Sequence, residues 1–358
     1  MYSNTKKIKS MIILLLFLFV IMVSLLQIGI VKAEGTIYIR ADGSIDPSTA
    51  PIQRNGDIYT LIGDFDDLLV LERNHTVFDG AGRAVGGIYG PLPVQVDYQW
   101  QINGTTNITI VNTVINGDGI FFLATSNSII ANNTLNNGRG LDCTGNRNII
   151  ANNTVNNGRG ISGSGNGNII SGNHLTNCNY TFDPASSPYG ILVGGSNNTV
   201  IGNYIVGTNG TAINVLTSFN NTIVGNQIAN NKVGIYTLNI YSQGSAHDNI
   251  IYYNNFINNT KNVENDVIMN TTVSVNSWDN GAVGNYWSDY NGTDNDGDGI
   301  GDIPYVIDEN NRDNYPLTAP VDIEVIPEFP SWVILSLLIT ATLLIIICKQ
   351  KPPKKSSD

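Results

Sequence analysis

A near-identical repeat limits what this chain can fold into more than any other feature of its sequence. Residues 128–140 read SIIANNTLNNGRG and residues 148–160 read NIIANNTVNNGRG, so they differ at two of thirteen positions. A repeat of about 20 residues is typical of solenoids, in which each repeat stacks on its neighbour and buries one side against it.

The same pattern continues on both sides of these segments. We align seven repeats, which open at Asn107, Ser128, Asn148, Asn168, Asn198, Asn221 and Asn249. Apolar or β-branched residues stand two and seven positions later, from Thr109 and Val114 in the first repeat to Ile251 and Phe256 in the last. An asparagine stands five positions after each opening residue, at Asn112, Asn133, Asn153, Asn173, Asn203, Asn226 and Asn254.

These columns predict short strands, because β-branched runs broken by Asn and Gly lack the 3.6-residue period of a helix. Two or three strands per repeat form one coil of a parallel β-helix, in which equivalent residues stack about 4.8 Å apart. We therefore expect an all-β fold with the apolar columns inside. The asparagine column is expected at a tight bend, where Asn tolerates a left-handed backbone and stacked amides bond from coil to coil.

Segments outside the repeats resemble one family. YIRADG at 38–43 and APIQR at 50–54 look like the leader of many archaeal members, and TVFDGAG at 76–82 looks like their first coil. GNYWSDY at 284–290 and DNYPL at 313–317 are similar to their closing element. The resemblance is to the right-handed β-helix family of NosD-type and carbohydrate-binding/sugar-hydrolysis (CASH) repeat proteins. It implies a right-handed parallel β-helix of about seven or more coils with a small Asp-rich C-terminal cap.

Apolar runs at both ends predict membrane segments. The run at residues 11–30 follows three lysines and reads as a signal peptide, with an uncleaved signal anchor as the alternative. The run at residues 331–348 precedes a basic tail, so we expect a transmembrane helix and place everything between the two runs outside the cytoplasm. The letters IPEFP at 326–330 resemble an archaeal Pro-Glu-Phe sorting signal, which implies that the tail could be cut and replaced by a lipid.

Seven parts follow from these features. They are a leader (1–33), an N-terminal cap and first coil (34–97), the repeats (98–270), a C-terminal cap with the Asp-rich loop (271–320), a Pro-rich linker (321–330), a transmembrane helix (331–348) and a basic cytoplasmic tail (349–358). The net charge of −11 argues against a nucleic-acid partner, because polyphosphate requires a basic surface. Cys143 and Cys178 allow at most one disulfide in the extracytoplasmic part, and buried free thiols are the alternative.

The stretch DNDGDGIGD at 294–302 predicts a calcium site. Its spacing matches the first nine positions of an EF-hand loop, with ligands Asp294, Asp296, Asp298, the Ile300 carbonyl and Asp302. Tyr305 stands where that loop carries its bidentate acid, so Asp289, Asp308 or Asp313 would have to complete the shell. We expect a structural calcium ion that stiffens the C-terminal cap. A solvated acidic turn is the alternative.

One small charged patch is the only candidate for catalysis. Asp118, Arg139 and Arg159 occupy the same position in three successive repeats, and Asp142 lies beside them. A structural ion pair is the alternative interpretation. A β-helix hydrolase needs two or three clustered carboxylates, whereas the repeats are nearly free of acids, so we do not expect an enzyme. A polysaccharide lyase or glycoside hydrolase remains the alternative function.

Sugar binding is the function that we favour. The longest repeat contains an insertion at residues 178–188, and Tyr180, Phe182 and Tyr189 in or beside it are candidates to stack on sugar rings. These aromatic side chains would alternatively cover the base of their own loop. Copper is not expected, because the histidines and cysteines do not cluster and Met269 is the one methionine beyond the leader. We expect a membrane-anchored protein of the cell surface that binds a glycan or a cell-envelope polymer.

Overall fold

The chain folds into a stack of parallel β-strands, and the flanking apolar runs lie outside the part that can be described. The computed structural model describes residues 35–91, 94–96, 99–101, 104–181, 187–239, 246–267 and 274–323. Every regular element in these ranges is a strand, so none of them contains a helix long and apolar enough to cross a membrane. The helices predicted near the two ends of the chain fall outside these ranges.

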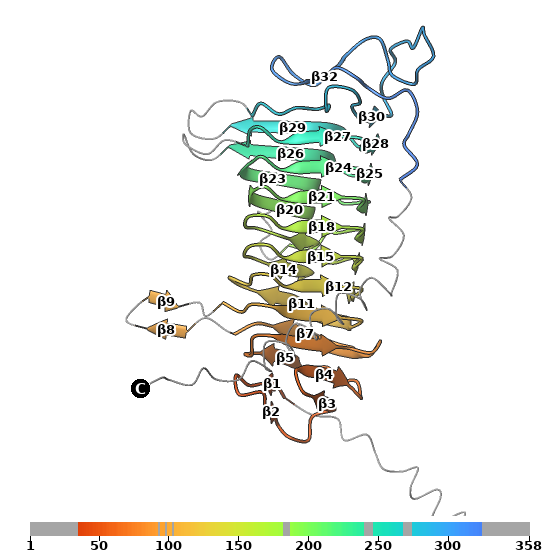
Figure 1. Ribbon diagram of the computed structural model, residues 1–358. Coiled ribbons are helices and arrows are strands. Elements are labelled where there is room, and N and C mark those ends of the chain that lie inside the picture. The colour runs from red at the N-terminus through yellow and green to blue at the C-terminus, as the bar shows by residue number, and fades with distance from the viewer. Residues whose placement is uncertain are drawn as a thin grey trace, which may run out of the picture.

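Two large sheets make up the stack (Figure 1). The 10-stranded sheet contains β3 (Ile52–Asn55), β4 (Ile58–Leu61), β6 (Thr76–Asp79), β10 (Ile108–Val111), β12 (Ile129–Ala131), β15 (Ile149–Ala151), β18 (Ile169–Ser171), β21 (Thr199–Ile201), β24 (Thr222–Val224) and β27 (Ile250–Tyr252). The 18-stranded sheet contains β1 (Ile37–Ile39), β2 (Ile45–Asp46), β5 (Leu68–Leu71), β7 (Ala84–Tyr89), β11 (Val114–Phe122), β13 (Thr134–Asn136), β14 (Leu141–Cys143), β16 (Thr154–Asn156), β17 (Ile161–Ser162), β19 (His174–Thr176), β20 (Tyr189–Ser196), β22 (Tyr204–Val206), β23 (Thr211–Phe219), β25 (Gln227–Ala229), β26 (Val233–Asn239), β28 (Asn255–Ile257), β29 (Lys261–Val267) and β30 (Tyr286–Trp287). Two short hairpins pair β8 (Val94–Val96) with β9 (Gln99–Gln101), and β31 (Tyr305–Val306) with β32 (Arg312–Asp313).

The strands of the coils form a β-helix because each pairs in parallel with its equivalent in the next coil, while two antiparallel pairs, β1–β2 and β3–β4, stand at the N-terminal end. β12, β15 and β18 pair in register through Ile130, Ile150 and Ile170, and the strands that follow them along the chain do the same on two further faces. The 10-stranded sheet alone crosses seven coils from β10 to β27. The right-handed parallel β-helix of seven or more coils is therefore confirmed.

Three aliphatic stacks fill the interior, one behind each face. Their side chains are 0–2% exposed, apart from Val263 at 8%. The first stack runs from Ile110 to Ile251, the second from Ile115 to Phe256 and the third from Ile120 to Val263. Cys143 and Cys178 are buried free thiols and do not form the possible disulfide. Burial raises the pKa of both to about 12.

The predicted register was wrong in the first repeat. Ile110, and not Thr109, pairs with Ile130, and Ile115, and not Val114, pairs with Leu135. The repeat therefore opens at Ile108, and Thr113 replaces Asn112 at its asparagine position. A slip of one residue exchanges the buried and exposed faces of a strand, so this correction decides which side chains enter the core.

Two buried asparagine ladders run along the stack where the sequence predicts one. Asn203 shows the pattern: its amide Nδ2 donates to Ile170 O and to Asn226 Oδ1, and its Oδ1 accepts from both nitrogens of Asn173. The ladder of Asn203 contains Asn133, Asn153, Asn173, Asn203, Asn226, Asn254 and Asn285. The second ladder contains the opening residues Asn148, Asn168, Asn198, Asn221 and Asn249, and then Asn276.

The position of the left-handed backbone also differs from the prediction. The ladder asparagines do not have positive φ; the residue before each one does, as at Asn132 (φ 57°) and Asn152 (φ 53°), except before the last member of each ladder. The left-handed residue turns the chain outward, and the next residue then points its amide inward. The prediction that stacked amides bond from coil to coil is confirmed, and the strained conformation belongs to the neighbouring position.

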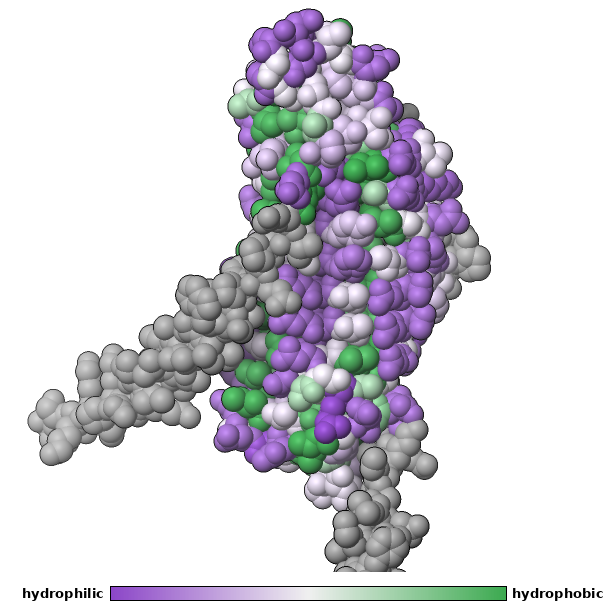
Figure 2. Space-filling view, turned by 90° about the vertical axis from the view of Figure 1, so that its right-hand side faces the viewer, coloured by the Kyte–Doolittle hydropathy of each residue, from purple (hydrophilic) through white to green (hydrophobic). Residues whose placement is uncertain are grey.

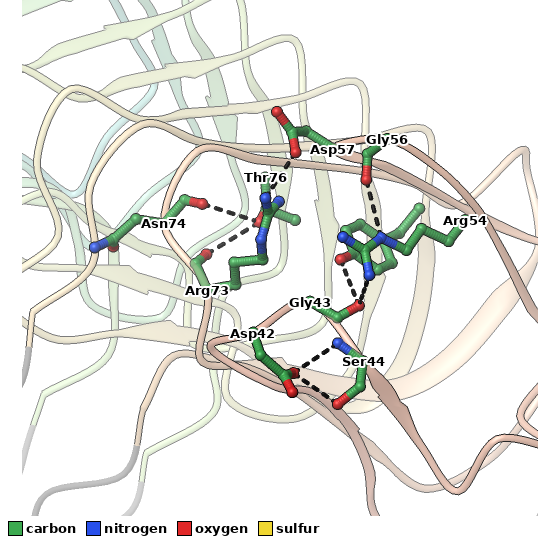
Figure 3. Close-up of polar contacts among 10 residues, drawn as sticks. Asp42, Gly43, Ser44, Arg54, Gly56, Asp57, Arg73, Asn74 and Thr76 are labelled. Atoms are coloured by element: carbon green, nitrogen blue, oxygen red, sulfur yellow. Dashed lines mark hydrogen bonds and ion pairs between the residues drawn. The ribbon is translucent and has the colours of Figure 1, made fainter.

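Different contacts close the two ends of the stack. At the N-terminal end, Arg54 donates to the carbonyls of Gly43 and Gly56, and the Tyr59 hydroxyl also donates to Gly43 O (Figure 3). At the C-terminal end, the Trp287 ring stacks between Phe256 and Tyr305 at centroid distances of 4.2 and 4.3 Å. Both arrangements cover coil edges that would otherwise expose unpaired strands.

The regular stacking is visible on the surface. Figure 2 shows one side of the molecule, on which hydrophilic and apolar residues form stripes along the length of the stack. Each stripe arises because a residue lies directly over its equivalent in the coil before it.

Candidate functional site

The predicted charged patch forms on the face made by β11, β14, β17 and β20. Because Ile120, Leu141, Ile161 and Ile191 pair in register, Asp118, Arg139, Arg159 and Tyr189 follow one another along one line. The Arg159 guanidinium carbon lies 5.2 Å from the ring centroid of Tyr189. Asp142 interacts electrostatically with Arg159. We call Asp118, Arg139, Asp142, Arg159 and Tyr189 the arginine patch.

Asp142 is the least solvated acid of the arginine patch. Burial raises the pKa of its carboxyl, and a hydrogen bond with Ser162 and the charge of Arg159 oppose that rise. Its Oδ1 is shielded and accepts no hydrogen bond from the part of the chain that is described. A raised pKa suits a general acid, but Asp118 is the only other carboxylate on this line and is exposed to solvent.

The insertion after β19 meets the stack at this patch. The Tyr180 amide donates to Gly158 O at 3.2 Å, beside Arg159, and the Tyr180 side chain is 39% exposed. Tyr189, at the other end of the insertion, is 6% exposed, and burial raises its pKa to about 12. Of the three predicted stacking residues, Tyr180 is therefore partly exposed, Tyr189 is held beneath Arg159, and Phe182 lies outside the described residues.

Sequence reasoning missed Tyr89. It stands one coil before Phe121, which its ring meets edge-on at a centroid distance of 5.7 Å. Burial raises the pKa of Tyr89, as does the charge of Asp118, while Arg139 lowers it, so Tyr89 lies at the lower end of the arginine patch. The signal was present in the sequence, because Gly87-Ile88 repeats the Gly-Ile pair that opens this strand in the later coils.

Three aspartates of the predicted calcium loop come together. Ligand atoms of Asp294, Asp296 and Asp298 lie within 4.8 Å of one another, and the backbone amides of Gly297 and Gly299 donate to Asp294. Asp302 instead accepts two hydrogen bonds from Asn295, and Ile300 forms a bridge to Leu317. Oxygen donors grouped in this way fit a hard cation such as Ca²⁺.

The acids expected to complete this shell are bonded elsewhere. Asp289 accepts from Tyr305 and Asn262, and Asp308 accepts from Asn311. Asp313 is buried and accepts from Asn285 and Trp287. Any remaining ligands would therefore have to come from the loop itself or from water.

Comparison with known proteins now decides the family. A family model described as "Periplasmic copper-binding protein (NosD)" matches residues 93–292, more than half of the chain. The chain belongs to the NosD family. Proteins described as "Probable ABC transporter binding protein NosD" from Pseudomonas aeruginosa and Stutzerimonas stutzeri are 35% and 34% identical over 106 residues. The match spans 30% of this chain and 22% of the length of those relatives.

Among solved structures, this chain is similar to the A-module of the Azotobacter vinelandii mannuronan C-5 epimerase AlgE4. That similarity has a TM-score of 0.30 and 14% identity, over 62% of this chain and 80% of the other. At this score, it supports no statement about activity.

The side chains of this chain do not fit the copper of the family's description. Copper prefers thiolate, thioether and imidazole ligands. Here His174 stacks on Tyr204, His75 contacts Asn107 and His247 contacts Asp248, while Cys143 and Cys178 are buried in the core. Within the described residues, the only group of three potential metal ligands is the aspartate set of the C-terminal loop, which does not suit copper. No role is therefore derived through copper.

Proposed function

We propose that this NosD-family protein works outside the cytoplasm, anchored to the membrane at the cell surface, and binds a carbohydrate polymer of the cell envelope. The family supports the extracytoplasmic location. Binding would take place along the arginine patch, with the Tyr180 ring stacking on a sugar ring and Arg139 donating to sugar oxygens. Anchoring would use the apolar run at residues 331–348.

The observation that carries the binding proposal is the position of Tyr180. A half-open aromatic ring stands on an insertion whose two ends flank Arg159, on a stack whose other outward rows are mostly Thr, Asn and aliphatic residues. Sugar rings bind proteins through an aromatic surface combined with a few hydrogen-bonding side chains at fixed places. A polymer running along the stack would meet the coils at intervals of about 4.8 Å, close to the length of one sugar unit.

Replacing Tyr180→Ala should weaken glycan binding about tenfold, because it removes the stacking surface and leaves the coils intact. Retardation in native gels that contain a panel of neutral and acidic polysaccharides measures this effect. Tyr253→Ala, at a similarly exposed tyrosine elsewhere on the stack, is the matched control and should migrate as wild type. If no polysaccharide retards the wild-type protein, or if Tyr180→Ala is retarded equally, the proposal is wrong.

A polysaccharide lyase or glycoside hydrolase is the second candidate, and the raised pKa of Asp142 favours it. The same glycans would then be cut, and the release of new reducing or unsaturated ends would show this. Asp142→Asn should abolish the release and retain the gel retardation, which separates catalysis from binding.

We also propose that the C-terminal loop binds calcium and thereby stabilises the cap. A cation that binds only the folded protein contributes about 2.7 kcal/mol at a hundredfold excess over its Kd. Chelation should therefore lower the melting temperature by a few degrees, and Asp296→Ala should lose most of this response. Asp248→Ala, an exposed acid away from the loop, should keep it. A wild-type melting curve that ignores the chelator would identify the loop as an acidic turn.

A further inference from the structure

Six glycosylation sequons of this chain share one backbone geometry. A sequon is the sequence Asn-X-Ser/Thr with X other than Pro, and outside the cytoplasm its asparagine can accept an N-linked sugar. Six of the sequons within the described residues begin at a bend of the coil, at an asparagine with positive φ: Asn107, Asn132, Asn152, Asn197, Asn220 and Asn258. We call these six the bend sequons. The other four described sequons begin at residues without this conformation: Asn74, Asn179, Asn209 and Asn291.

The bend geometry turns the asparagine and the threonine of a sequon to the same side. Asn132 is exposed, Asn133 points into the stack and is buried, and Thr134 is again on the outer side. In every bend sequon the middle residue is more buried than at least one of its two neighbours, because successive side chains of an extended chain point to opposite sides. Since sugar transfer requires both the asparagine amide and the hydroxyl two residues later, each bend presents the complete acceptor outward.

Three of the six carboxamides are engaged within the stack. Asn107 Nδ2 lies 3.0 Å from His75 Nε2, and Asn197 Nδ2 donates to the hydroxyl of the serine before it at 3.2 Å. Asn152 is half-buried, and a Cβ on Gly172 in the next coil would clash with its Oδ1. These three nitrogens are therefore poor acceptors in the folded protein.

The other three carboxamides are open. Asn132, Asn220 and Asn258 are exposed, and the Nδ2 of each donates to no other group within the described residues. Their backbone positions are fixed all the same, as by the bond from Asn132 N to Ala151 O. They stand at three different bends of the coil, because Asn132 follows β12, Asn220 follows β23 and Asn258 follows β28.

We propose that Asn132, Asn220 and Asn258 carry N-linked glycans. The reaction joins Nδ2 to the anomeric carbon of an oligosaccharide, breaks the bond from that carbon to the phosphate of a lipid-linked donor, and releases one proton from Nδ2. The cell supplies the donor and the transferase, and this chain supplies the acceptor. The proposal depends on the extracytoplasmic location that the family supports, and it is independent of glycan binding at the arginine patch.

The stacking of coils limits how many sites can be filled. Asn132 and Asn152 occupy equivalent places in neighbouring coils, about 4.8 Å apart, and so do Asn220 and Asn197. This spacing is no wider than one sugar ring, so a glycan on the open residue covers the engaged one. Each of these pairs should therefore accept one glycan.

Mass spectrometry of glycopeptides from the protein, purified from the cells that make it, tests the proposal. Sugar should be found at Asn132, Asn220 and Asn258, with occupancies at least about tenfold higher than at the three engaged bend sequons. No single molecule should carry sugar on both Asn132 and Asn152. A bare asparagine at all three open sites, equal occupancy at the engaged sites, or sugar confined to the four sequons outside the bends would overturn the proposal.

Thr134 provides a matched pair of variants that leave Asn132 in place. Thr134→Val has nearly the same shape and suits a strand, so it removes the hydroxyl without disturbing the coil. Sugar should disappear from Asn132 and remain on Asn220 in the same molecules. Thr134→Ser keeps a hydroxyl and should keep the sugar. Sugar that persists on Asn132 in Thr134→Val would show that this bend is not read as a sequon, which contradicts the proposal.

Discussion

Asn203→Ala should destabilise the protein by about 3–5 kcal/mol. The substitution leaves Ile170 O without its donor and removes the acceptor of the buried Asn173 amide, and each buried group left unpaired costs about 1–3 kcal/mol. The bond to Asn226 is lost as well, in a region with no access to water. Urea unfolding measures the effect as a lower midpoint with an unchanged slope.

Asn209→Ala is the matched control, because Asn209 is exposed and donates to Asn179 Oδ1 through its backbone amide, which the substitution keeps. It should shift stability by less than about 0.5 kcal/mol. An Asn203→Ala protein as stable as this control would show that water enters the ladder and replaces the lost amide.

Asp313→Asn should change the pH dependence of stability. Asp313 is fully buried at the end of the Asn203 ladder, and burial raises its pKa to about 6, against the opposing effect of hydrogen bonds from Asn285, Trp287 and Tyr315. The folded protein then holds a proton that the unfolded chain releases near its ordinary pKa of 3.8. The free energy that Asp313 contributes to folding is complete below that pH and is lost as the pH rises through about 6. The whole loss is about 3 kcal/mol, because each unit of pKa difference corresponds to about 1.4 kcal/mol.

The measurement is the difference in unfolding free energy between wild type and Asp313→Asn at pH 4 and pH 7. The variant stays neutral, so its stability relative to wild type should rise by about 2.4 kcal/mol over this interval, since a small part of the full effect lies outside it. A small constant penalty is expected in addition, because the new amide faces the Tyr315 N–H, which now donates to Asp313 Oδ1. A difference that does not change with pH would mean that Asp313 is ionised in the folded protein at both values.

The sequence was sufficient for the architecture because the core columns consist of residues that behave alike. Ile130, Ile150 and Ile170 fill equivalent places, and any alignment that keeps the spacing finds them. The predicted register of the first repeat was wrong because Ile108 and Thr113 replace the asparagine or serine found at these positions in later repeats. An alignment based on asparagine therefore chose Asn107 and Asn112 instead. The left-handed backbone was predicted one residue too late for a related reason. Asn132 and Asn133 are both asparagine, but Asn132 adopts the left-handed conformation and Asn133 forms the ladder.

The candidate site could be predicted only where it follows from the repeat. Asp118, Arg139 and Arg159 were placed in line because stacking is periodic. The burial of Tyr189, the bonds that Asn295 makes to Asp302 and the use of Asp313 in the ladder depend on side-chain packing, which has no period in the sequence. Function was harder still, because a regular stack supports many different surfaces.

The equivalence of neighbouring coils makes the height of this molecule adjustable independently of its chemistry. Asn148 N donates to Asn168 Oδ1, and Ser128 N donates to Asn148 Oδ1 in the same way. If residues 148–167 were excised, Ser128 would meet Asn168 with the same bond, and each aliphatic column would close over the gap. Internal duplication would have the opposite effect, so the separation of the two caps can change by insertion or deletion in increments of about 4.8 Å. Such a chain can be fitted to a target of a new length without designing a new fold.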